Sequence, residues 1–149
     1  MRLCCVLPIT MCVLLFFSGC SDSGPKVARV TGTVMMDGSP LADAIVSFEP
    51  TGPGRPSIGN TDANGYYRLQ YTTDLDGALL GTHTVRISTK QFVYNEDVGD
   101  DRPRPERVPP KYNIESSLNA IVESGGSEID FDLNSDGFKP KNLKFEDFE

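Results

Sequence analysis

Several residue types that build functional sites are scarce in this chain of 149 residues. There is no tryptophan, there is one histidine, and all four cysteines lie within the first 20 residues. Residues 21–149 therefore offer no thiol for a disulfide, a nucleophile or a metal ligand. A single histidine without a free cysteine cannot form the usual zinc-binding set, so we expect no metal and no cofactor.

Basic residues are also in the minority. The 14 Lys and Arg face 21 Asp and Glu, which gives a formal net charge of −7 at pH 7. Nucleic-acid phosphates need clustered Lys and Arg, so this balance argues against a nucleic-acid partner. It does not identify a positively charged partner either, because a moderate negative charge is a common way to stay soluble.

The chain has no apolar run long enough to span a bilayer comfortably. The longest run is Leu3–Phe17, which is interrupted by Pro8 and Thr10 and follows the basic Arg2. A run of about 15 apolar residues behind a positive start is typical of a signal peptide.

A cysteine follows this run. Phe17-Ser18-Gly19-Cys20 resembles the bacterial lipobox, in which the cysteine is acylated and the chain is cut just before it. Phe17 stands where leucine is usual, but it keeps the apolar character. The resemblance implies a signal peptide over residues 1–19 and a lipid on Cys20. At about 0.8 kcal/mol per buried methylene, two or three acyl chains would hold the protein firmly to a membrane.

The alternatives to a lipid anchor are an ordinary signal peptide and an N-terminal anchor that stays uncut. With the lipid, the protein belongs to the cell envelope outside the cytoplasm. Ser21 favours the outer membrane, if a sorting rule known from some bacteria applies.

The rest of the chain divides into three parts. Residues 20–27 are mostly small and polar, and we expect them to form a lipidated tether. Residues 28–134 carry the alternating patterns of a folded domain. Residues 135–149 are polar and charged, and their apolar residues are spaced too irregularly for a helix, so we expect a C-terminal tail.

Within residues 28–134, apolar and polar residues alternate in short runs, which is typical of strands with one buried face. Turn signals such as Asp37-Gly38 separate the runs. Strands are predicted over 28–36, 44–50, 57–61, 66–72, 82–89, 118–122 and 129–133. Two packed antiparallel sheets would hide one apolar face each, so we expect an all-β antiparallel sandwich of about seven short strands. The alternative is an unrelated all-β barrel.

The stretch Gln91–Asn113 interrupts this rhythm. It contains four prolines and a dense block of charges, from which we predict a long loop without a strand. A long loop in a compact domain is usually functional or mobile. The candidate partner-binding residues in it are Arg102, Arg104, Arg107, Lys111 and Tyr112. The alternative is a solvated loop whose acids and bases neutralise one another.

Five short motifs follow one another in the first half of the domain. They are Val30–Val34, Asp37–Leu41, Ala44–Phe48, Thr61–Leu69 and Gly81–Ile87. In this order, and behind the lipobox, they resemble the carboxypeptidase regulatory-like domain, which has a prealbumin-like (transthyretin-like) β-sandwich. The later Val108–Asn113, Ser117-Leu118 and Asp130–Leu133 resemble the closing half of small bacterial lipoproteins built on that domain. The resemblance implies a non-catalytic accessory domain of the cell envelope.

The residues give little support to catalysis. His83 shares a strand face with Val85 and Ile87, so we interpret it as structural. No Gly-x-Ser-x-Gly elbow presents a serine nucleophile. A hydrolase branch of prealbumin-like folds has several histidines and a Tyr-Arg-Gly-Ser terminus, a pattern that this sequence does not fit. We therefore expect no enzyme activity.

Two further binding hypotheses depend on single residue types. Asp62 and Asn64 resemble the start of a calcium loop, but the later oxygen ligands of an EF-hand are missing and a tight turn explains them. Exposed tyrosines could stack on sugars, although half-buried strand tyrosines are the ordinary case. The candidates are Tyr66, Tyr71, Tyr94 and Tyr112. The expected partner is thus an unidentified envelope protein or a glycan.

Overall fold

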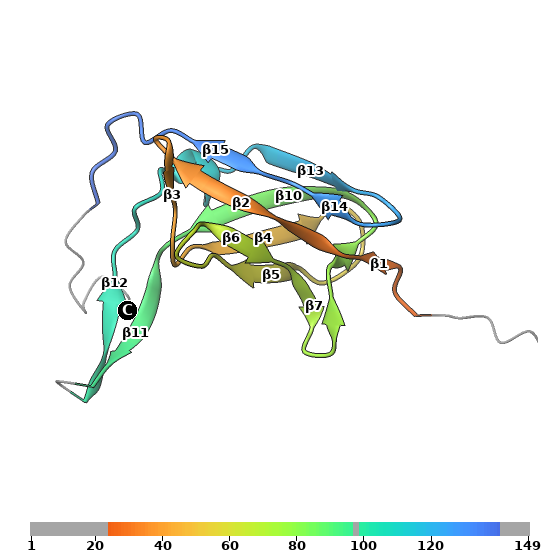
Figure 1. Ribbon diagram of the computed structural model, residues 1–149, viewed down its shortest axis with the longest axis horizontal. Helices are drawn as coiled ribbons and strands as arrows, with labels where there is room; N and C mark the ends of the chain where they lie inside the picture. The colour runs from red at the N-terminus through yellow and green to blue at the C-terminus, as the bar shows by residue number, and fades with distance from the viewer. Residues whose placement is uncertain (1–23, 97–98, 141–149) are drawn as a thin grey trace, which may run out of the picture.

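The computed structural model describes residues 24–96 and 99–140, and its architecture is all-β (Figure 1). The predicted all-β sandwich is confirmed. The signal peptide over 1–19, the lipidation site Cys20 and residues 141–149 of the predicted tail lie outside the described residues. Among the residues that are described, no helix is long and apolar enough to cross a membrane.

The elements are short. In chain order they are β1 (Val27–Ala28), β2 (Val30–Met36), β3 (Ser39–Pro40), β4 (Ile45–Pro50), β5 (Ser57–Asn60), β6 (Tyr66–Arg68), β7 (Gln70–Thr72), β8 (Leu75–Asp76), β9 (Ala78–Leu79), β10 (Gly81–Ser88), β11 (Gln91–Asn95), β12 (Asp100–Arg104), the 3₁₀ turn η1 (Pro110–Tyr112), β13 (Leu118–Val122), β14 (Ser127–Glu128) and β15 (Phe131–Leu133).

The larger sheet is antiparallel, with the strand order β13-β10-β4-β5-β7-β8. Its centre is the pair β4–β10, which runs in register from His83 opposite Pro50 to Ser88 opposite Ile45. Buried residues alternate with more exposed ones along both strands, as the sequence pattern predicts. One face of this sheet therefore forms one wall of the core.

The second sheet is built on β2. β6 and β3 pair with β2 antiparallel, whereas β14 and β15 pair with it parallel. The parallel pairing departs from the purely antiparallel sandwich expected from the sequence, because alternation reveals a buried face but not the direction of a neighbouring strand. β14 and β15 lie along the same edge of β2. The backbone carbonyls of Arg29 and Thr31, two residues apart, point to this edge and accept hydrogen bonds from Ser127 N and Ile129 N.

Asp130 fills the gap between β14 and β15. Its Oδ1 accepts hydrogen bonds from the backbone N of Thr33 at 2.7 Å and from the Thr33 hydroxyl at 2.8 Å. A side chain thus supplies the acceptor that the interrupted ladder lacks at this point. The two short segments act as one interrupted strand beside β2.

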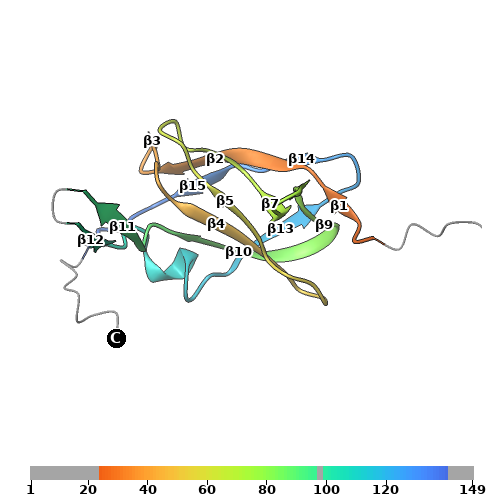
Figure 2. The same ribbon diagram turned by 90° about the horizontal axis from the view of Figure 1, so that it is seen from below.

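The two sheets are joined along one side. β6 pairs with β2, and β7, which follows it directly, pairs with β5 in the larger sheet. β1, just before β2, pairs with β9. Figure 2 shows β2 on one side of the molecule and β10 on the other.

Aromatic side chains fill the space between the sheets. Phe48 contacts Tyr67 and Phe131, with ring centroids 6.4 and 6.2 Å apart. Tyr67 is fully buried, and its hydroxyl donates to the Ile129 carbonyl at 2.7 Å, which satisfies its one polar group. Aliphatic residues complete the core, among them Val30, Val34, Val46, Leu69, Val85, Ile87 and Val108.

The stretch 91–113 differs from the prediction. It is not a strandless loop: β11 and β12 form an antiparallel hairpin, and η1 follows. Pro103 is compatible with β12 because the hairpin has only two strands, so β12 is an edge strand where a missing N–H is tolerated. Val108 is fully buried, so the end of this stretch belongs to the core.

Candidate binding surface at the β11–β12 hairpin

The hairpin extends beyond the sandwich at the end opposite β1 (Figures 1 and 2). Its register runs from Gln91 opposite Arg104 to Asn95 opposite Asp100. The described chain begins at Gly24, so the hairpin and the start of the domain lie at opposite ends of the molecule. The hairpin thus belongs to the end of the described domain that lies away from the N-terminal segment.

Three large apolar side chains on β11 face solvent. Phe92 is 46 % exposed, Val93 37 % and Tyr94 61 %. Single exposed hydrophobic residues are ordinary, but here Phe92 and Tyr94 are exposed on one face of the strand and Val93 on the other, so both faces of a projecting hairpin offer apolar side chains to a partner. Only Tyr94 was among the candidates from sequence.

A carboxylate fastens the base of the hairpin. Oε1 of Glu106 accepts hydrogen bonds from Thr89 N at 2.9 Å, Thr89 Oγ1 at 3.0 Å and Val108 N at 2.9 Å. Its Oε2 accepts one from the Ser88 hydroxyl. Glu106 therefore ties the end of β10, where the chain enters the hairpin, to the segment where it leaves.

A second attachment joins the hairpin to the turn before β4. Arg104 Nη1 lies 2.6 Å from Asp43 Oδ2, and Gln91 Nε2 donates to the Asp43 carbonyl at 3.1 Å. Arg107 donates to the Ala42 carbonyl. With Glu106, these contacts hold both strands of the hairpin at their base while its far part stands clear of the sandwich.

The basic residues proposed from sequence thus make contacts within the fold. Arg104 and Arg107 bind the turn at residues 42–43, and Lys111 forms an ion pair with Asp136. The Lys111 ammonium also lies 4.7 Å from the Tyr112 ring centroid, and its hydrogen bond to Asp136 raises its pKa. Arg102 belongs to β12, but its side chain lies outside the described part, as does Cys20. Among the side chains that the structure describes, Arg104, Arg107 and Lys111 thus point to partners within the fold and do not form one basic surface.

A cleft of about 570 Å³ lies beside the hairpin base. Residues of β10 and the stretch just after it line one side, and the segment after β12 lines the other. The principal lining residues are Arg86, Ser88, Lys90, Glu106, Pro110 and Ile114. The volume falls within the range of roughly 300–1,000 Å³ that is typical of small-ligand pockets.

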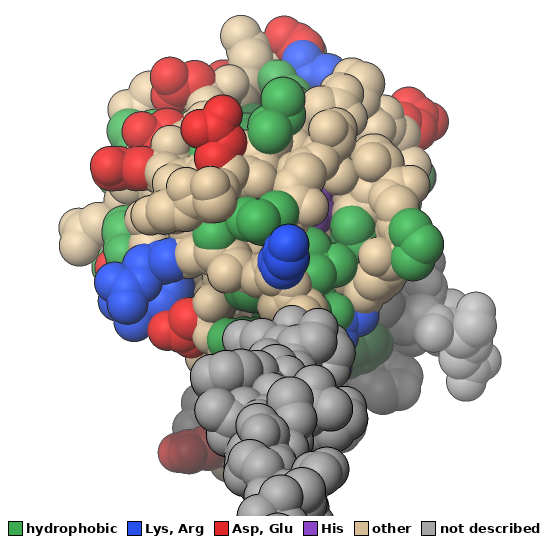
Figure 3. Space-filling view, turned by 90° about the vertical axis from the view of Figure 1, so that its right-hand side faces the viewer, with side chains coloured by type: hydrophobic (Ala, Val, Ile, Leu, Met, Phe, Trp, Pro, Cys, Tyr) green, Lys and Arg blue, Asp and Glu red, His purple; other side chains and the backbone are tan. Residues whose placement is uncertain are grey.

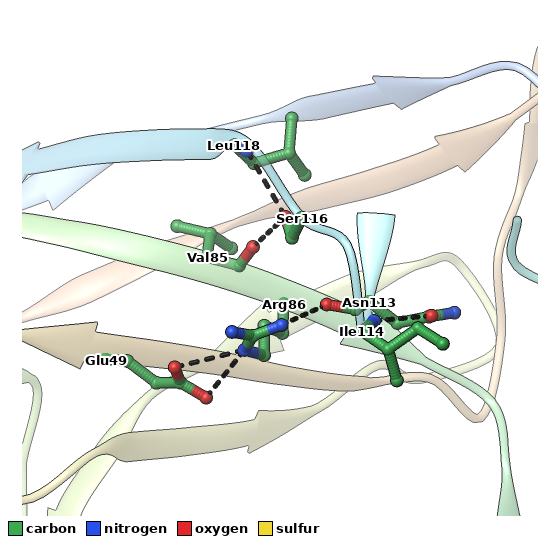
Figure 4. A network of polar contacts seen from close by, with 7 residues as sticks. All are labelled: Glu49, Val85, Arg86, Asn113, Ile114, Ser116 and Leu118. Carbon is green, nitrogen blue, oxygen red and sulfur yellow. Dashed lines mark hydrogen bonds and ion pairs between the residues drawn. The ribbon is translucent and has the colours of Figure 1, made fainter. Parts of the chain in front are cut away.

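Arg86 on β10 joins two other parts of the chain beside the cleft, β4 and the segment after η1 (Figure 4). Its Nε donates to both carboxylate oxygens of Glu49 at 3.0 Å, and its Nη1 donates to the Asn113 carbonyl. The buried Asn113 side chain donates to Val108 O at 3.0 Å and accepts from Ile114 N at 2.6 Å. Because a half-exposed ion pair adds little stability, we interpret this network as positioning the segment 108–114 on β10.

The Asp62 turn is explained by folding. Asp62 Oδ1 accepts from Asn64 N at 2.8 Å and from Tyr66 N at 2.9 Å, which is the usual role of aspartate at the first position of a tight turn. Within residues 24–96 and 99–140, no three His, Cys, Asp or Glu side chains gather as a metal site would require.

The four candidate tyrosines lie on four different elements. Tyr66 is on β6, Tyr71 on β7, Tyr94 on β11 and Tyr112 on η1. The Tyr71 ring lies under the Arg55 guanidinium at 5.9 Å, and the Tyr112 hydroxyl accepts from Asn134 N at 3.1 Å. The fold assigns these tyrosines to separate local environments.

His83 is buried between the sheets, and only 1 % of it is exposed. Figure 3 shows the end of the sandwich near β1, where neighbouring atoms hide almost all of the histidine, which is coloured purple. The His83 ring lies 5.8 Å from that of Phe48, and Nδ1 lies 3.0 Å from the Gly81 carbonyl. Nε2 has no hydrogen-bond partner among the described residues. Burial lowers the pKa of His83, and the Gly81 contact opposes this effect.

Acidification is therefore expected to destabilise the fold through His83. The unfolded chain takes up a proton near pH 6.5, whereas the folded chain resists protonation, so stability falls as the pH drops below 6.5 and is unaffected by His83 well above it. Urea unfolding of wild type and His83→Leu at pH 7 and pH 5 tests this. Between pH 7 and pH 5, His83→Leu should lose less unfolding free energy than wild type. An equal loss in the two proteins would contradict the role given to His83.

Comparisons with known proteins give little guidance. No family model and no curated protein sequence matches this chain. Among solved structures, the crystal structure of a 9R-lipoxygenase from Cyanothece PCC8801 shows 12 % sequence identity and a TM-score of 0.37. The match covers 73 % of this chain and 16 % of the lipoxygenase chain. A likeness this weak bears on neither ancestry nor function.

Proposed function

We propose that this protein is a lipid-anchored, non-catalytic interaction module of the bacterial cell envelope, and that the β11–β12 hairpin is its binding element. The lipobox-like Phe17–Cys20 supports the anchor, and Ser21 favours the outer membrane. The all-β sandwich agrees with the resemblance to the carboxypeptidase regulatory-like domain, which implies an accessory role.

One observation carries the proposal: the exposed Phe92, Val93 and Tyr94 stand on a hairpin at the end of the molecule opposite its N-terminal side. Cys20 precedes the described domain by a few residues, which can span about 14 Å when fully extended. A lipid on Cys20 would therefore keep the β1 end near the membrane. The hairpin would then face away from that membrane, toward a partner.

A protein partner is favoured over a glycan. The tyrosines that prompted the glycan hypothesis lie on four elements, whereas the three apolar residues of β11 are adjacent. Buried apolar residues at the centre of an interface commonly dominate binding energy. The interaction module therefore takes precedence over the glycan-binding alternative.

The anchor and the hairpin are tested together in the full-length protein. In cell fractions, Cys20→Ser is expected to move the protein from the membrane to the soluble fraction. The Val93→Ala/Tyr94→Ala double variant should stay membrane-bound but recover at least about tenfold less partner in a crosslinked pulldown, the loss typical of a central contact.

Two exposed residues of the sandwich serve as matched controls. Tyr66→Ala and Ile121→Ala remove similar exposed side chains from β6 and β13 and should leave recovery unchanged. Equal recovery by the hairpin variant and wild type would refute the binding role. Deleting the whole stretch 91–113 is a poor test, because Val108 and Asn113 are buried and the deletion would damage the core.

A further inference from the structure

A second hollow of the surface lies where β5, β6 and β7 meet, and we call it the β5–β7 groove. β7 lies toward the β1 end of the molecule, away from the β11–β12 hairpin (Figures 1 and 2). The groove has a volume of about 310 Å³, at the lower end of the range typical of small-ligand sites. Its large lining side chains are those of Arg55, Ile58, Asn60, Arg68, Gln70 and Tyr71.

The register between β5 and β7 sets four of these side chains beside one another. Ile58 lies opposite Gln70, and the same antiparallel register continues to Asn60 opposite Arg68. All four are exposed, whereas Leu69, between Arg68 and Gln70, is buried in the core. The four side chains therefore share the outer face of the sheet.

Two guanidinium groups line the groove, and no carboxylate does so among the described residues. The Arg55 guanidinium lies 5.9 Å from the Tyr71 ring centroid, within cation–π reach. Arg68 Nη1 lies 3.8 Å from Asp76 Oδ2, and the two side chains are 52 % and 40 % exposed. An ion pair this long and this exposed contributes little. Both arginines therefore keep donors for a ligand.

Neutral polar side chains complete the groove. In the part of the chain that the structure describes, the amides of Asn60 and Gln70 and the hydroxyls of Thr72 and Thr73 have no hydrogen-bond partner. Amides and hydroxyls both donate and accept, so they match sugar hydroxyls, which also do both. Ile58, 49 % exposed, adds an apolar surface on which the C–H face of a sugar ring can pack.

We infer that the β5–β7 groove binds a glycan that carries anionic groups. Arg55 and Arg68 bind its carboxylate or phosphate, because guanidinium groups hold such anions through paired, charge-assisted hydrogen bonds. Asn60 and Gln70 bind its hydroxyls. The groove is separate from the hairpin, so this second binding site goes beyond the proposed function and does not depend on it.

A flat anionic membrane surface would fit the same arginines less well. Asp74 and Asp76 stand outside the lining, next to it in the chain, and would face headgroups of their own sign. A glycan chain that lies in the groove contacts the lining, which holds the arginines without these acids. The arrangement therefore favours a glycan over a membrane.

The first experiment presents the full-length protein, held in neutral detergent, with an array of glycans. Some carry uronic acid or phosphate groups, and others are neutral counterparts of the same length. We expect binding to be confined to acidic members, and the members bound distinguish carboxylate from phosphate. No binding, or equal binding to the neutral counterparts, would overturn the inference. Binding to phosphatidylglycerol vesicles without any glycan binding would also overturn it. The hairpin pulldown is unaffected by each of these outcomes.

The second experiment measures, by calorimetry, the affinity for the acidic oligosaccharide that binds best. Arg55→Gln and Arg68→Gln are each expected to weaken binding at least about tenfold, the effect of losing a charge-assisted hydrogen bond to an anion. The matched control Arg29→Gln removes the same charge from an exposed position between β1 and β2 and should bind like wild type. Wild-type affinity in both groove variants would refute the site.

Asp76→Asn separates a binding role of Arg68 from a merely structural one. Without the 3.8 Å ion pair, Arg68 can give all its donors to the ligand, so affinity for the acidic oligosaccharide should rise about threefold. Affinity for neutral glycans should not change. Equal or lower affinity for the acidic oligosaccharide would contradict the assignment of Arg68 as an anion-binding group.

Discussion

Replacing Gly32 with alanine is expected to destabilise the protein by about 3 kcal/mol or more, which is a large effect for a single methyl group. Gly32 lies at the centre of β2, and a Cβ atom there would sit 1.8 Å from the Ile129 carbonyl oxygen and 3.1 Å from the Tyr67 ring. A backbone oxygen cannot move aside as a flexible side chain can. The methyl group would push the segment 127–133 away from β2.

Urea denaturation measures this loss, and hydrogen exchange of β14 and β15 locates it. Gly52→Ala is the matched control, because no atom lies within 4 Å of a Cβ at that position. The control should unfold like wild type. A Gly32→Ala protein of unchanged stability would show that β2 and the last strands are not packed as described.

Removing the Glu106 carboxylate is expected to have the second-largest effect. Glu106→Ala leaves the backbone N–H groups of Thr89 and Val108, both fully buried residues, without their acceptor. Each buried unsatisfied donor costs about 1–3 kcal/mol, so the variant should lose about 3 kcal/mol. Glu106→Gln keeps one oxygen as an acceptor and should lose about 1 kcal/mol.

This prediction has a second observable, because Glu106 also joins the two ends of the hairpin. In Glu106→Ala, amide exchange of β11 and β12 should accelerate more than that of β4 and β10. Glu115→Ala, a change at an exposed glutamate just beyond η1, should alter neither stability nor exchange. Uniform acceleration across all strands would mean that Glu106 supports the core but does not position the hairpin.

The strands of the sandwich could be predicted because their burial follows a simple period. Val46 and Phe48 on β4, and Val85 and Ile87 on β10, alternate with more exposed residues, and the structure buries all four. This pattern is local, so a single sequence suffices to find it. The buried position of His83 follows from the same alternation.

The hairpin could not be predicted with the same rule, because prolines and charges conceal it. Phe92, Val93 and Tyr94 are strong strand formers, and Gly99 marks a turn among acids, which together are a hairpin signal. The four prolines of the stretch argue against strands, but Pro103 lies on an edge strand where it disrupts no sheet. The contacts of Glu106 and Arg104 were also hidden, since their partners are distant in sequence.

Strand direction and the role of Asp130 were likewise inaccessible. Alternation over 129–133 predicts a strand with Asp130 on its outer face, but does not reveal that this carboxylate caps Thr33 of β2. Such contacts depend on which strands become neighbours. That choice is made by the whole core.

The pairing of β2 with β14 and β15 sets the order in which the molecule can be completed. The hydrogen bond between Thr33 and Asp130 joins residues 97 positions apart, so the first long strand must wait for the last ones. β2 precedes these strands by most of the chain, and one row of its backbone groups stays unpaired until residues 127–133 join it. During that interval β2 is an open template that another strand can occupy, so mispairing at this edge is a hazard of the fold.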